Sequence, residues 1–321
     1  MMDLESFHAR RAALIYNPIA RGLSRNPHSL QRTIAVLAKH GVEAMLVATT
    51  GPGSATDQVR RQIEAGCELI IVAGGDGTIN EAANGMLHTN VPMAILPGGT
   101  ANVLAREMHM RGPMERLATR LPQWKPRRVA LGRLQAAGDV PRTFLCMAGA
   151  GLDAEIVARL NLDLKAAAGK LAYYIAGFSH VFHPLREFEV LVDGRVYQAS
   201  FALISRVRNY GGDLEIARGA SLLSDDFEVV LFRGTMSVRY LPYLLGVALG
   251  RAHQMQGCTV TRGCSVICNP PKEGDIFVQI DGELAGKLPI TTDIVRNALT
   301  LLMPPDYLAR EQSFAAVPAC A

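Results

Sequence analysis

The chain has 321 residues, of which 49% are hydrophobic and 19% charged, and its formal net charge is +4. This length exceeds what one hydrophobic core usually holds, so we expect two domains, and the composition excludes an extensively disordered chain. Residues 1–11 lack the apolar core of a signal peptide. No apolar run approaches the roughly 20 residues needed to cross a bilayer, so we expect a soluble, cytoplasmic protein.

Strands and helices are predicted to alternate in the first third of the chain. Strands are expected at residues 12–16, 42–49, 69–73 and 91–96, and helices at 79–87 and 101–108. Two further helices are expected, one with Asn26 as its N-cap and one that Ser54 caps. This alternation is typical of parallel βαβ units, which bind ligands outside the carboxyl ends of their strands. Four turns share that edge, at residues 17–18, 49–54, 74–78 and 97–100, so we expect them to converge on one site.

The chain after residue 128 has a different pattern, with many short strands and few helices. Strands are expected at residues 129–134, 142–148, 187–191, 196–204, 227–232, 258–268 and 276–280, and helices at 164–181 and 238–249. This pattern predicts an antiparallel β-domain. We therefore expect an α/β domain with a parallel, Rossmann-like sheet at residues 8–128 and a β-rich domain at 129–303, with residues 304–321 free to pack back on the first domain.

Residues 74–80 read Gly-Gly-Asp-Gly-Thr-Ile-Asn and directly follow an apolar strand. Glycine permits close approach to the backbone, and the N–H groups of such a turn and of the next helix form an anion site. Asp76 would repel a phosphate unless a cation lies between them, which indicates a nucleotide with a divalent metal. One such turn could be ordinary, but Pro97–Thr100 repeats the pattern, and we expect Thr78 and Thr100 to cap the helices that follow.

Two other features leave alternatives open. Residues 106–133 contain eight basic and two acidic residues, which could form a solvated surface or could meet anionic lipid. Nucleic acid is disfavoured because Trp124 is the one aromatic residue among these charges. Six scattered cysteines include no CxxC pair, so buried free thiols are expected rather than zinc ligands or disulfides.

The glycine-rich turns carry a family resemblance. Gly74–Glu81 and Leu96–Asn102 resemble the nucleotide loops of the diacylglycerol kinase catalytic domain, which bacterial diacylglycerol kinases, sphingosine and ceramide kinases and YegS-like lipid kinases share. Further matching segments are Asn17-Pro18, Thr49 with Gly53-Ser54-Ala55 (Ser where the family has Asp), Asn84-Gly85, Asn209–Gly212 and Asp281-Gly282-Glu283. The core Gly-Gly-Asp-Gly-Thr alone is also found in NAD kinases and phosphofructokinases, but the ordered set runs from about residue 11 to 303.

The resemblance implies a lipid kinase that uses ATP and Mg²⁺, with a C-terminal antiparallel β-sandwich. It implies that Asp281 or Glu283 takes the proton from the lipid hydroxyl, although a plain Asp-Gly hairpin turn is the alternative. The nucleotide-binding residues that it implies are Asn17, Thr49, Gly74, Gly75, Asp76, Gly77, Thr78, Ile79, Asn80, Glu81 (as support for the loop or the metal) and Thr100.

A second, structural Mg²⁺ site is implied by the bacterial relatives. Its ligands would be the Asp225 side chain and the backbone carbonyls of Leu222 and Phe227. Asp226 stands where the family usually has Gly, so the ligand could be either Asp, or the segment could be a solvated turn. The implied partners are ATP and a lipid at the membrane surface, either diacylglycerol or a sphingoid base, with peripheral membrane association. An edge strand could pair with a second copy of the chain. The alternatives are an NAD kinase-like enzyme and a non-catalytic nucleotide- or lipid-binding protein.

Overall fold

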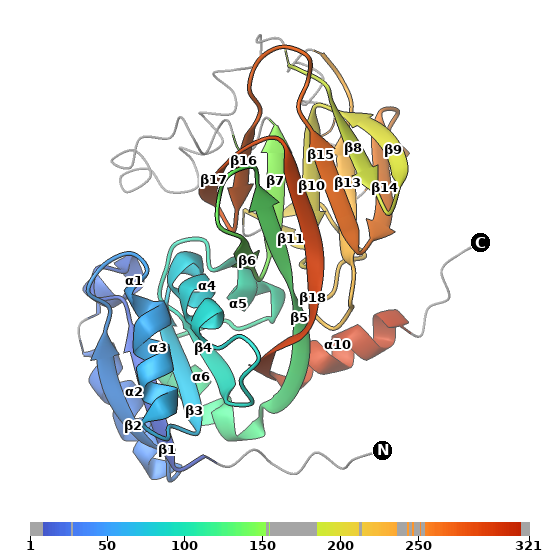
Figure 1. Cartoon of the computed structure of the whole chain (residues 1–321). Helices are drawn as coiled ribbons and strands as arrows, with labels where there is room; N and C mark the ends of the chain where they lie inside the picture. Colours follow the sequence, from blue (N-terminus) through green and yellow to red (C-terminus); the bar gives the residue numbers. More distant parts are fainter. Residues whose placement is uncertain are drawn as a thin grey trace. The chain divides into compact units, whose positions relative to one another are not determined.

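The structure is a computed structural model, and it describes residues 9–26, 28–151, 154, 185–211, 214–235, 243, 246, 251 and 254–315. Two compact units make up the chain (Figure 1): unit 1 is Met1–Ala130 with Arg296–Ala321, and unit 2 is Leu131–Val295. The helices expected at 164–181 and 238–249 lie outside the described residues, apart from Tyr243 and Gly246, which are helical.

Unit 1 is built on a parallel sheet. Its strands are β1 (Arg11–Tyr16), β2 (Glu43–Ala48), β3 (Leu69–Gly74) and β4 (Pro92–Pro97), in the order β2-β1-β3-β4. The last part of β18 (Ile290–Met303) adds a parallel strand beside β4, where Thr300 pairs with Pro92. All of β3 is buried, which explains its continuous apolar sequence.

Helices cover this sheet. They are α1 (Arg21–Ser24), α2 (Ser29–Lys39), α3 (Ser54–Glu64), α4 (Asp76–Gly85), α5 (Val103–Glu107), α6 (Met114–Arg120), the 3₁₀ turn η1 (Leu121–Gln123) and α10 (Pro305–Ala315). Helix α3 packs against α4, and α2 packs against α6. In Figure 1, α3 and α4 lie in front of the sheet.

Three helix starts differ from the prediction by two residues or more. Helix α5 begins at Val103, two residues later than expected. Helix α2 begins at Ser29 with His28 as its N-cap, not at Asn26. Asn26 lies in the preceding turn, where its carbonyl accepts the Ser29 N–H and its side-chain oxygen accepts a bond from Arg32. Helix α4 begins at Asp76, three residues earlier than expected, so the glycine-rich stretch is itself the first turn of the helix.

Unit 2 is an antiparallel β-sandwich. One sheet has the order β14-β13-β10-β7-β16-β17. In the other, the first part of β18 pairs with β15, and β8 and β9 follow in that order. Strand β5 also pairs with β18, and β6 pairs with β5. The strands are β5 (Lys125–Ala136), β6 (Arg142–Phe144), β7 (Met147–Gly151), β8 (Phe188–Val192), β9 (Arg195–Ala199), β10 (Phe201–Ser205), β11 (Asn209–Tyr210), β12 (Leu214–Glu215), β13 (Phe227–Phe232), β14 (Cys258–Gly263), β15 (Ser265–Asn269), β16 (Phe277–Ile280) and β17 (Glu283–Lys287). The predicted fold class, a parallel α/β domain followed by an antiparallel β-sandwich, is confirmed.

Three strands predicted as continuous are each divided in two. The expected strands 142–148, 196–204 and 258–268 break between β6 and β7, at Ser200, and at Cys264. At each break the chain leaves one sheet and enters the other. At the first two breaks, both halves place residues in the same sandwich core, so the hydrophobic pattern does not mark the break. At the third break, β14 is mostly exposed or half-buried, and only β15 contributes to that core.

Phe144 lies at the centre of this core. Its ring is fully buried and stacks on Phe227 with a centroid distance of 5.9 Å, and Gly132 leaves the space that its ring edge fills. Replacing Phe144 with Ala is therefore expected to lower the free energy of unfolding by about 3–5 kcal/mol, measured by chemical denaturation. Val140 is 81% exposed, so Val140→Ala is the matched control and should change it by less than about 0.5 kcal/mol. An equal effect of both substitutions would contradict this assignment.

The described cysteines are free; three are buried, as the sequence predicts, whereas Cys258 and Cys264 are only half-buried. Burial raises the pKa of the Cys258 thiol to about 11 and that of Cys268 to about 12. Since the thiolate is the reactive form, iodoacetamide at pH 8 should leave both residues unmodified in the folded protein and should label them after unfolding, as read by mass spectrometry. Rapid labelling of Cys268 in the folded protein would contradict its burial.

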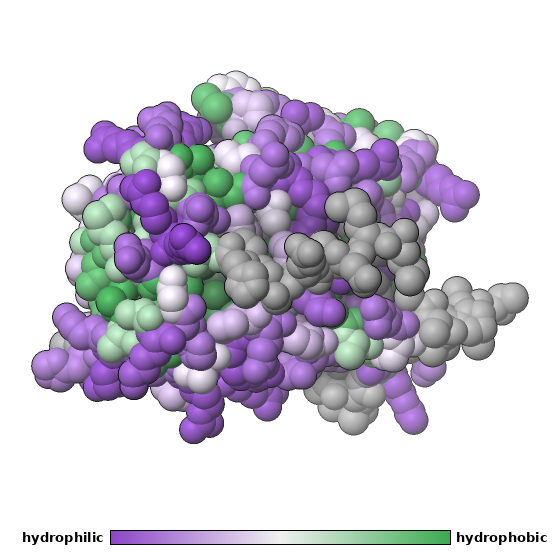
Figure 2. Space-filling model, turned by 90° about the horizontal axis from the view of Figure 1, so that it is seen from below, coloured by the Kyte–Doolittle hydropathy of each residue, from purple (hydrophilic) through white to green (hydrophobic). Residues whose placement is uncertain are grey.

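Hydrophilic residues cover most of the face of the molecule that Figure 2 shows, with smaller hydrophobic areas between them. Within the described part of the chain, no helix is long and apolar enough to span a bilayer.

Candidate functional site

Three glycine-containing segments meet backbone to backbone at the carboxyl edge of the unit 1 sheet. The Gly98 N–H donates to the Gly74 carbonyl (2.8 Å), and the Gly22 N–H donates to the Gly98 carbonyl (2.9 Å). A Cβ on Gly99 would lie 2.5 Å from the Gly75 Cα, closer than real Cβ atoms approach. The turns after β3 and β4 are therefore in contact, and glycine is required where they touch.

Asn17 connects the end of β1 to the turn after β3. Its backbone N–H donates to the Ala73 carbonyl (3.1 Å), and its side-chain Nδ2 donates to the Thr78 hydroxyl (3.4 Å). Thr49 follows β2 and donates its N–H to the Tyr16 carbonyl (2.8 Å). The structure thus brings Asn17 and Thr78 together, with Thr49 joined to the adjacent strand end.

Helix α4 starts inside the glycine-rich turn. Its N-cap is Gly75, no side chain caps it, and Asp76, Gly77 and Thr78 form its first turn. The prediction that Thr78 caps the helix is wrong, because its hydroxyl accepts the bond from Asn17. The first N–H groups of a helix have no partner within the helix, so this ten-residue helix offers donors and a positive dipole end to an anion.

Asp76 is half-buried at the start of α4. Its Oδ1 accepts the Leu104 N–H (3.3 Å). Burial raises the pKa of this carboxyl, and backbone N–H donors at residues 102–104 offset the effect only in part. The carboxylate therefore faces the start of α5.

Asp76 fits an Mg²⁺ ion that accompanies a nucleotide. In the described residues there is no cluster of three or more His, Cys, Asp or Glu side chains that could hold a metal. Mg²⁺ at a nucleotide typically takes one or two carboxylates and completes its shell with phosphate oxygens and water, so a single carboxylate beside an anion site suits this chemistry.

Asn102 is a functional candidate that was not predicted from the sequence as a site residue. Its Oδ1 accepts the Gly99 N–H (2.8 Å), its Nδ2 donates to the Gly99 carbonyl (2.9 Å), and its φ is +49°. It is also the N-cap residue of α5, a role predicted for Thr100, which instead lies exposed in the turn. An Asn that ends a glycine-rich turn is the signal for this role, since Asn tolerates positive φ.

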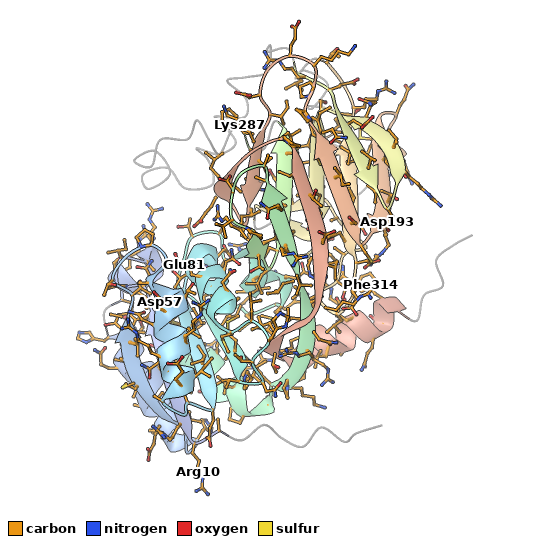
Figure 3. The ribbon with its side chains drawn as sticks, in the orientation of Figure 1. Arg10, Asp57, Glu81, Asp193, Lys287 and Phe314 are labelled. Atoms are coloured by element: carbon orange, nitrogen blue, oxygen red, sulfur yellow. The ribbon has the colours of Figure 1, made fainter. Side chains whose placement is uncertain are left out.

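The remaining predicted residues of α4 support the turn from behind. Ile79 is 1% exposed and belongs to the core, and Asn80 is buried with its carbonyl bonded to Asn84. The Glu81 carbonyl accepts the Thr56 hydroxyl (2.7 Å), and its Oε2 accepts the Ala55 N–H (3.4 Å). Glu81, labelled in Figure 3, therefore ties α4 to the first turn of α3.

Asp281 and Gly282 form the two-residue turn between β16 and β17 in unit 2. Their φ values are +47° and +84°, as a tight hairpin turn requires, and Ile280 pairs with Glu283 across it. The Asp281 carboxylate accepts backbone N–H bonds from Leu145 (3.0 Å to Oδ2) and from Cys146 and Met147 (each 2.9 Å to Oδ1). These bonds hold the carboxylate against the segment that joins β6 to β7.

Glu283 has a different environment. It is exposed, and its Oε2 lies 3.4 Å from Nη2 of Arg142, whose other nitrogen donates to the Leu284 carbonyl (3.1 Å). Because Gly282 turns the chain, the two carboxylates occupy opposite ends of the hairpin turn rather than one face of a strand. Of the two, Glu283 is accessible to a substrate, and Asp281 is held in place by backbone donors.

The predicted structural metal ligands lie on the segment before β13 and at the first residue of that strand. The side chains of Leu222 and Phe227 are buried in the core and Asp225 is exposed. The Leu222 carbonyl accepts a bond from Arg206 Nη2 (2.9 Å). The ligand set stays a prediction of the sequence. In the predicted Asn209–Gly212 segment, Asn209 and Tyr210 form β11, which pairs with β12, and Gly212 lies outside the described residues.

The basic segment 106–133 is partly structural. Arg106 donates to the Ala101 carbonyl (2.7 Å), Arg120 pairs with Asp306 (2.7 Å), and Arg128 donates to the Thr89 carbonyl (2.5 Å). Other basic residues in it are exposed, namely Arg111, Arg116, Lys125 and Arg133. Part of the charge therefore stabilises unit 1, and the rest faces solvent.

Comparison with known proteins matches both parts of the chain. Residues 11–134 match the diacylglycerol kinase catalytic domain, and residues 146–303 match the YegS C-terminal NAD kinase beta sandwich-like domain. A diacylglycerol kinase of Bacillus subtilis (strain 168) is 28% identical over 287 residues, which cover 87% of this chain and 92% of that protein. A diacylglycerol kinase of Staphylococcus carnosus (strain TM300) is 25% identical over 302 residues, which cover 92% of this chain and 96% of that protein.

The fold is also shared with a solved structure. A diacylglycerol kinase from Bacillus anthracis str. Sterne aligns with a TM-score of 0.74 and 22% identity, covering 94% of this chain and 99% of that one. The two domain matches follow one another along most of the sequence and agree with the α/β and β-sandwich units. The chain therefore belongs to the diacylglycerol kinase family, a family of lipid kinases.

Proposed function

We propose that this protein transfers the γ-phosphoryl group of ATP, with Mg²⁺, to a hydroxyl of diacylglycerol or of a sphingoid base. The observation that carries the proposal is the contact between the turns after β3 and β4, with Asp76 in the first turn of α4. It joins helix N–H donors and a carboxylate at one sheet edge, which is the chemistry that a nucleotide with a metal needs.

In this proposal unit 1 holds the nucleotide. The polyphosphate would contact the N–H groups of the two glycine-rich turns, and Mg²⁺ at Asp76 would supply charge neutralisation. Asn17 and Thr49 would contact the nucleotide from the neighbouring strand ends, while Asn102 and Glu81 would keep the turns in shape. The nucleotide-binding residues would thus be Asn17, Thr49, Gly74–Asn80 and Thr100.

Unit 2 would supply the base. Glu283 takes the proton of the lipid hydroxyl, whose oxygen forms a bond to the γ-phosphorus as the bond to the β,γ-bridging oxygen breaks and ADP leaves. Asp281 is assigned as a positioning residue, because its carboxylate already accepts three backbone bonds. The products are the phosphorylated lipid, ADP and a proton.

The acceptor is embedded in a membrane, so the protein has to reach a lipid surface. The exposed Arg111, Arg116 and Lys125 support reversible docking on anionic lipid, since each basic residue near such a surface contributes about 1 kcal/mol. Co-sedimentation with vesicles tests this: binding to anionic vesicles should exceed binding to neutral ones and should fall in high salt.

The enzyme assay measures label transfer from γ-labelled ATP to three acceptors: diacylglycerol in mixed vesicles, sphingosine in the same vesicles, and NAD. The proposal expects label in a lipid, dependent on MgCl₂. Label in NAD alone would favour an NAD kinase-like enzyme. ATP binding without any labelled product would favour a non-catalytic binding protein.

A further inference from the structure

Arg206 is a fully buried cation in unit 2. It directly follows β10, and its exposed fraction is 0%. Its guanidinium donates to three carbonyl oxygens of one turn: Nη2 to Leu222 (2.9 Å), and Nη1 to Ser224 (2.9 Å) and Asp226 (3.3 Å). Carbonyls of alternate residues thus converge on a single positive group.

Other arginines hold the same loop. Arg262 of β14 makes two bonds to the Asp226 carboxylate (2.8 and 2.6 Å) and donates to the Gly219 carbonyl (2.7 Å). Arg208 donates to the Arg218 carbonyl (2.9 Å). The Asp226 side chain is therefore committed to Arg262, while its carbonyl faces Arg206.

Converging carbonyl oxygens are also the ligands that a hard divalent cation prefers. Here the Leu222 carbonyl, one ligand of the Mg²⁺ ion predicted from the sequence, already accepts a guanidinium bond. An ion bound to that oxygen would lie within a few ångströms of a buried positive charge, and like charges at that distance repel strongly in a protein interior. The residues present therefore do not fit a metal at this turn.

We propose that Arg206 is the built-in cation of the turn at residues 221–226, in place of the Mg²⁺ ion that Leu222, Asp225 and Phe227 would hold. The turn at residues 221–226 then needs no divalent metal to fold.

The first test is thermal unfolding of the full chain without nucleotide, in EDTA and in millimolar MgCl₂. The expected result is the same midpoint in both, for the wild type and for Asp225→Ala. A wild-type midpoint that falls in EDTA, by an amount that Asp225→Ala abolishes, would show a structural metal and overturn the proposal. Mn²⁺ binding followed by electron paramagnetic resonance, again without nucleotide, should be equal for these two proteins.

The second test removes the internal cation. Arg206→Met leaves three carbonyls without this donor, of which that of Leu222 is buried, so the midpoint should fall by about 5 °C or more. Arg195→Met is the matched control, because Arg195 is an exposed arginine of β9 in the same unit, and it should leave the midpoint unchanged.

Arg206→Lys keeps the charge but loses the planar guanidinium group, so its midpoint should fall between those of the wild type and Arg206→Met. An unchanged midpoint for Arg206→Met would overturn the proposal. If that variant does not fold, Arg206→Lys and the EDTA comparison still test it.

Discussion

Replacing Glu283 with Gln is expected to lower kcat for lipid phosphorylation by at least about 100-fold, as the loss of a general base does. The free energy of unfolding should change by less than about 0.5 kcal/mol. The Glu283 side chain is exposed and its ion pair with Arg142 spans 3.4 Å, and exposed pairs of this kind contribute little to stability. The substitution keeps the shape of the side chain and removes its ability to take a proton.

Asp281→Asn should behave differently, because it should lower both activity and stability. Asn has a single side-chain oxygen, so it cannot replace both oxygens that accept the Leu145, Cys146 and Met147 N–H groups. Leaving a buried donor without its acceptor costs about 1–3 kcal/mol. Asn tolerates the positive φ at this position, so the loss does not come from backbone strain.

The two variants are compared by steady-state kinetics with labelled ATP and by denaturation in guanidinium chloride. Glu215→Gln is the matched control, since Glu215 is a Glu of unit 2 that also has an exposed ion pair, with Arg218 at 3.7 Å, and it should change neither quantity. If Glu283→Gln keeps full kcat while Asp281→Asn loses it without loss of stability, the assigned roles are reversed.

The parallel part of unit 1 could be predicted because its signals are local. Strands β1, β3 and β4 are apolar runs that end at or just before Asn17, Gly74 and Pro97, and a buried parallel strand such as β3 needs little else to be recognised. The helix starts were less predictable, because tertiary contacts decide them. Thr78 looks like a cap residue, but its hydroxyl bonds to Asn17, 61 residues earlier in the chain.

The sandwich shows a second limit. The hydrophobic pattern of 196–204 is continuous, yet β9 and β10 belong to different sheets and the chain crosses between them at Ser200. Periodicity records which residues face the core, and both sheets face the same core. Where a strand changes sheet is set by packing across the sandwich.

Site residues that belong to a sequence motif, such as Asp76, could be predicted from the sequence. Gly22 and Arg206 could not be found this way, because their roles depend on distant backbone groups: the Gly98 carbonyl for Gly22, and the Leu222 carbonyl for Arg206. A glycine or an arginine gives no sequence signal of such a contact. The motif of Leu222, Asp225 and Phe227 likewise does not reveal the guanidinium beside it.

The contact between the glycine-rich turns leads to the second large effect, expected for Gly99→Ala. The new Cβ would lie 2.5 Å from the Gly75 Cα and 3.0 Å from the Asn102 side-chain oxygen. The closer neighbour is backbone, which cannot rotate away, so one of the two turns has to move. Overpacking of this kind typically costs about 1–3 kcal/mol of unfolding free energy.

The same shift should weaken ATP binding by at least about tenfold, because a displacement of a few tenths of an ångström or more misaligns the N–H donors of both turns. Calorimetric titration with Mg-ATP measures the affinity, and denaturation measures the stability. Gly51→Ala is the matched control: no atom lies within 4 Å of its Cβ position and its φ is not positive, so its unfolding free energy should be unchanged. A folded Gly99→Ala protein that binds Mg-ATP as tightly as the wild type would show that the junction of the two turns does not form the nucleotide site.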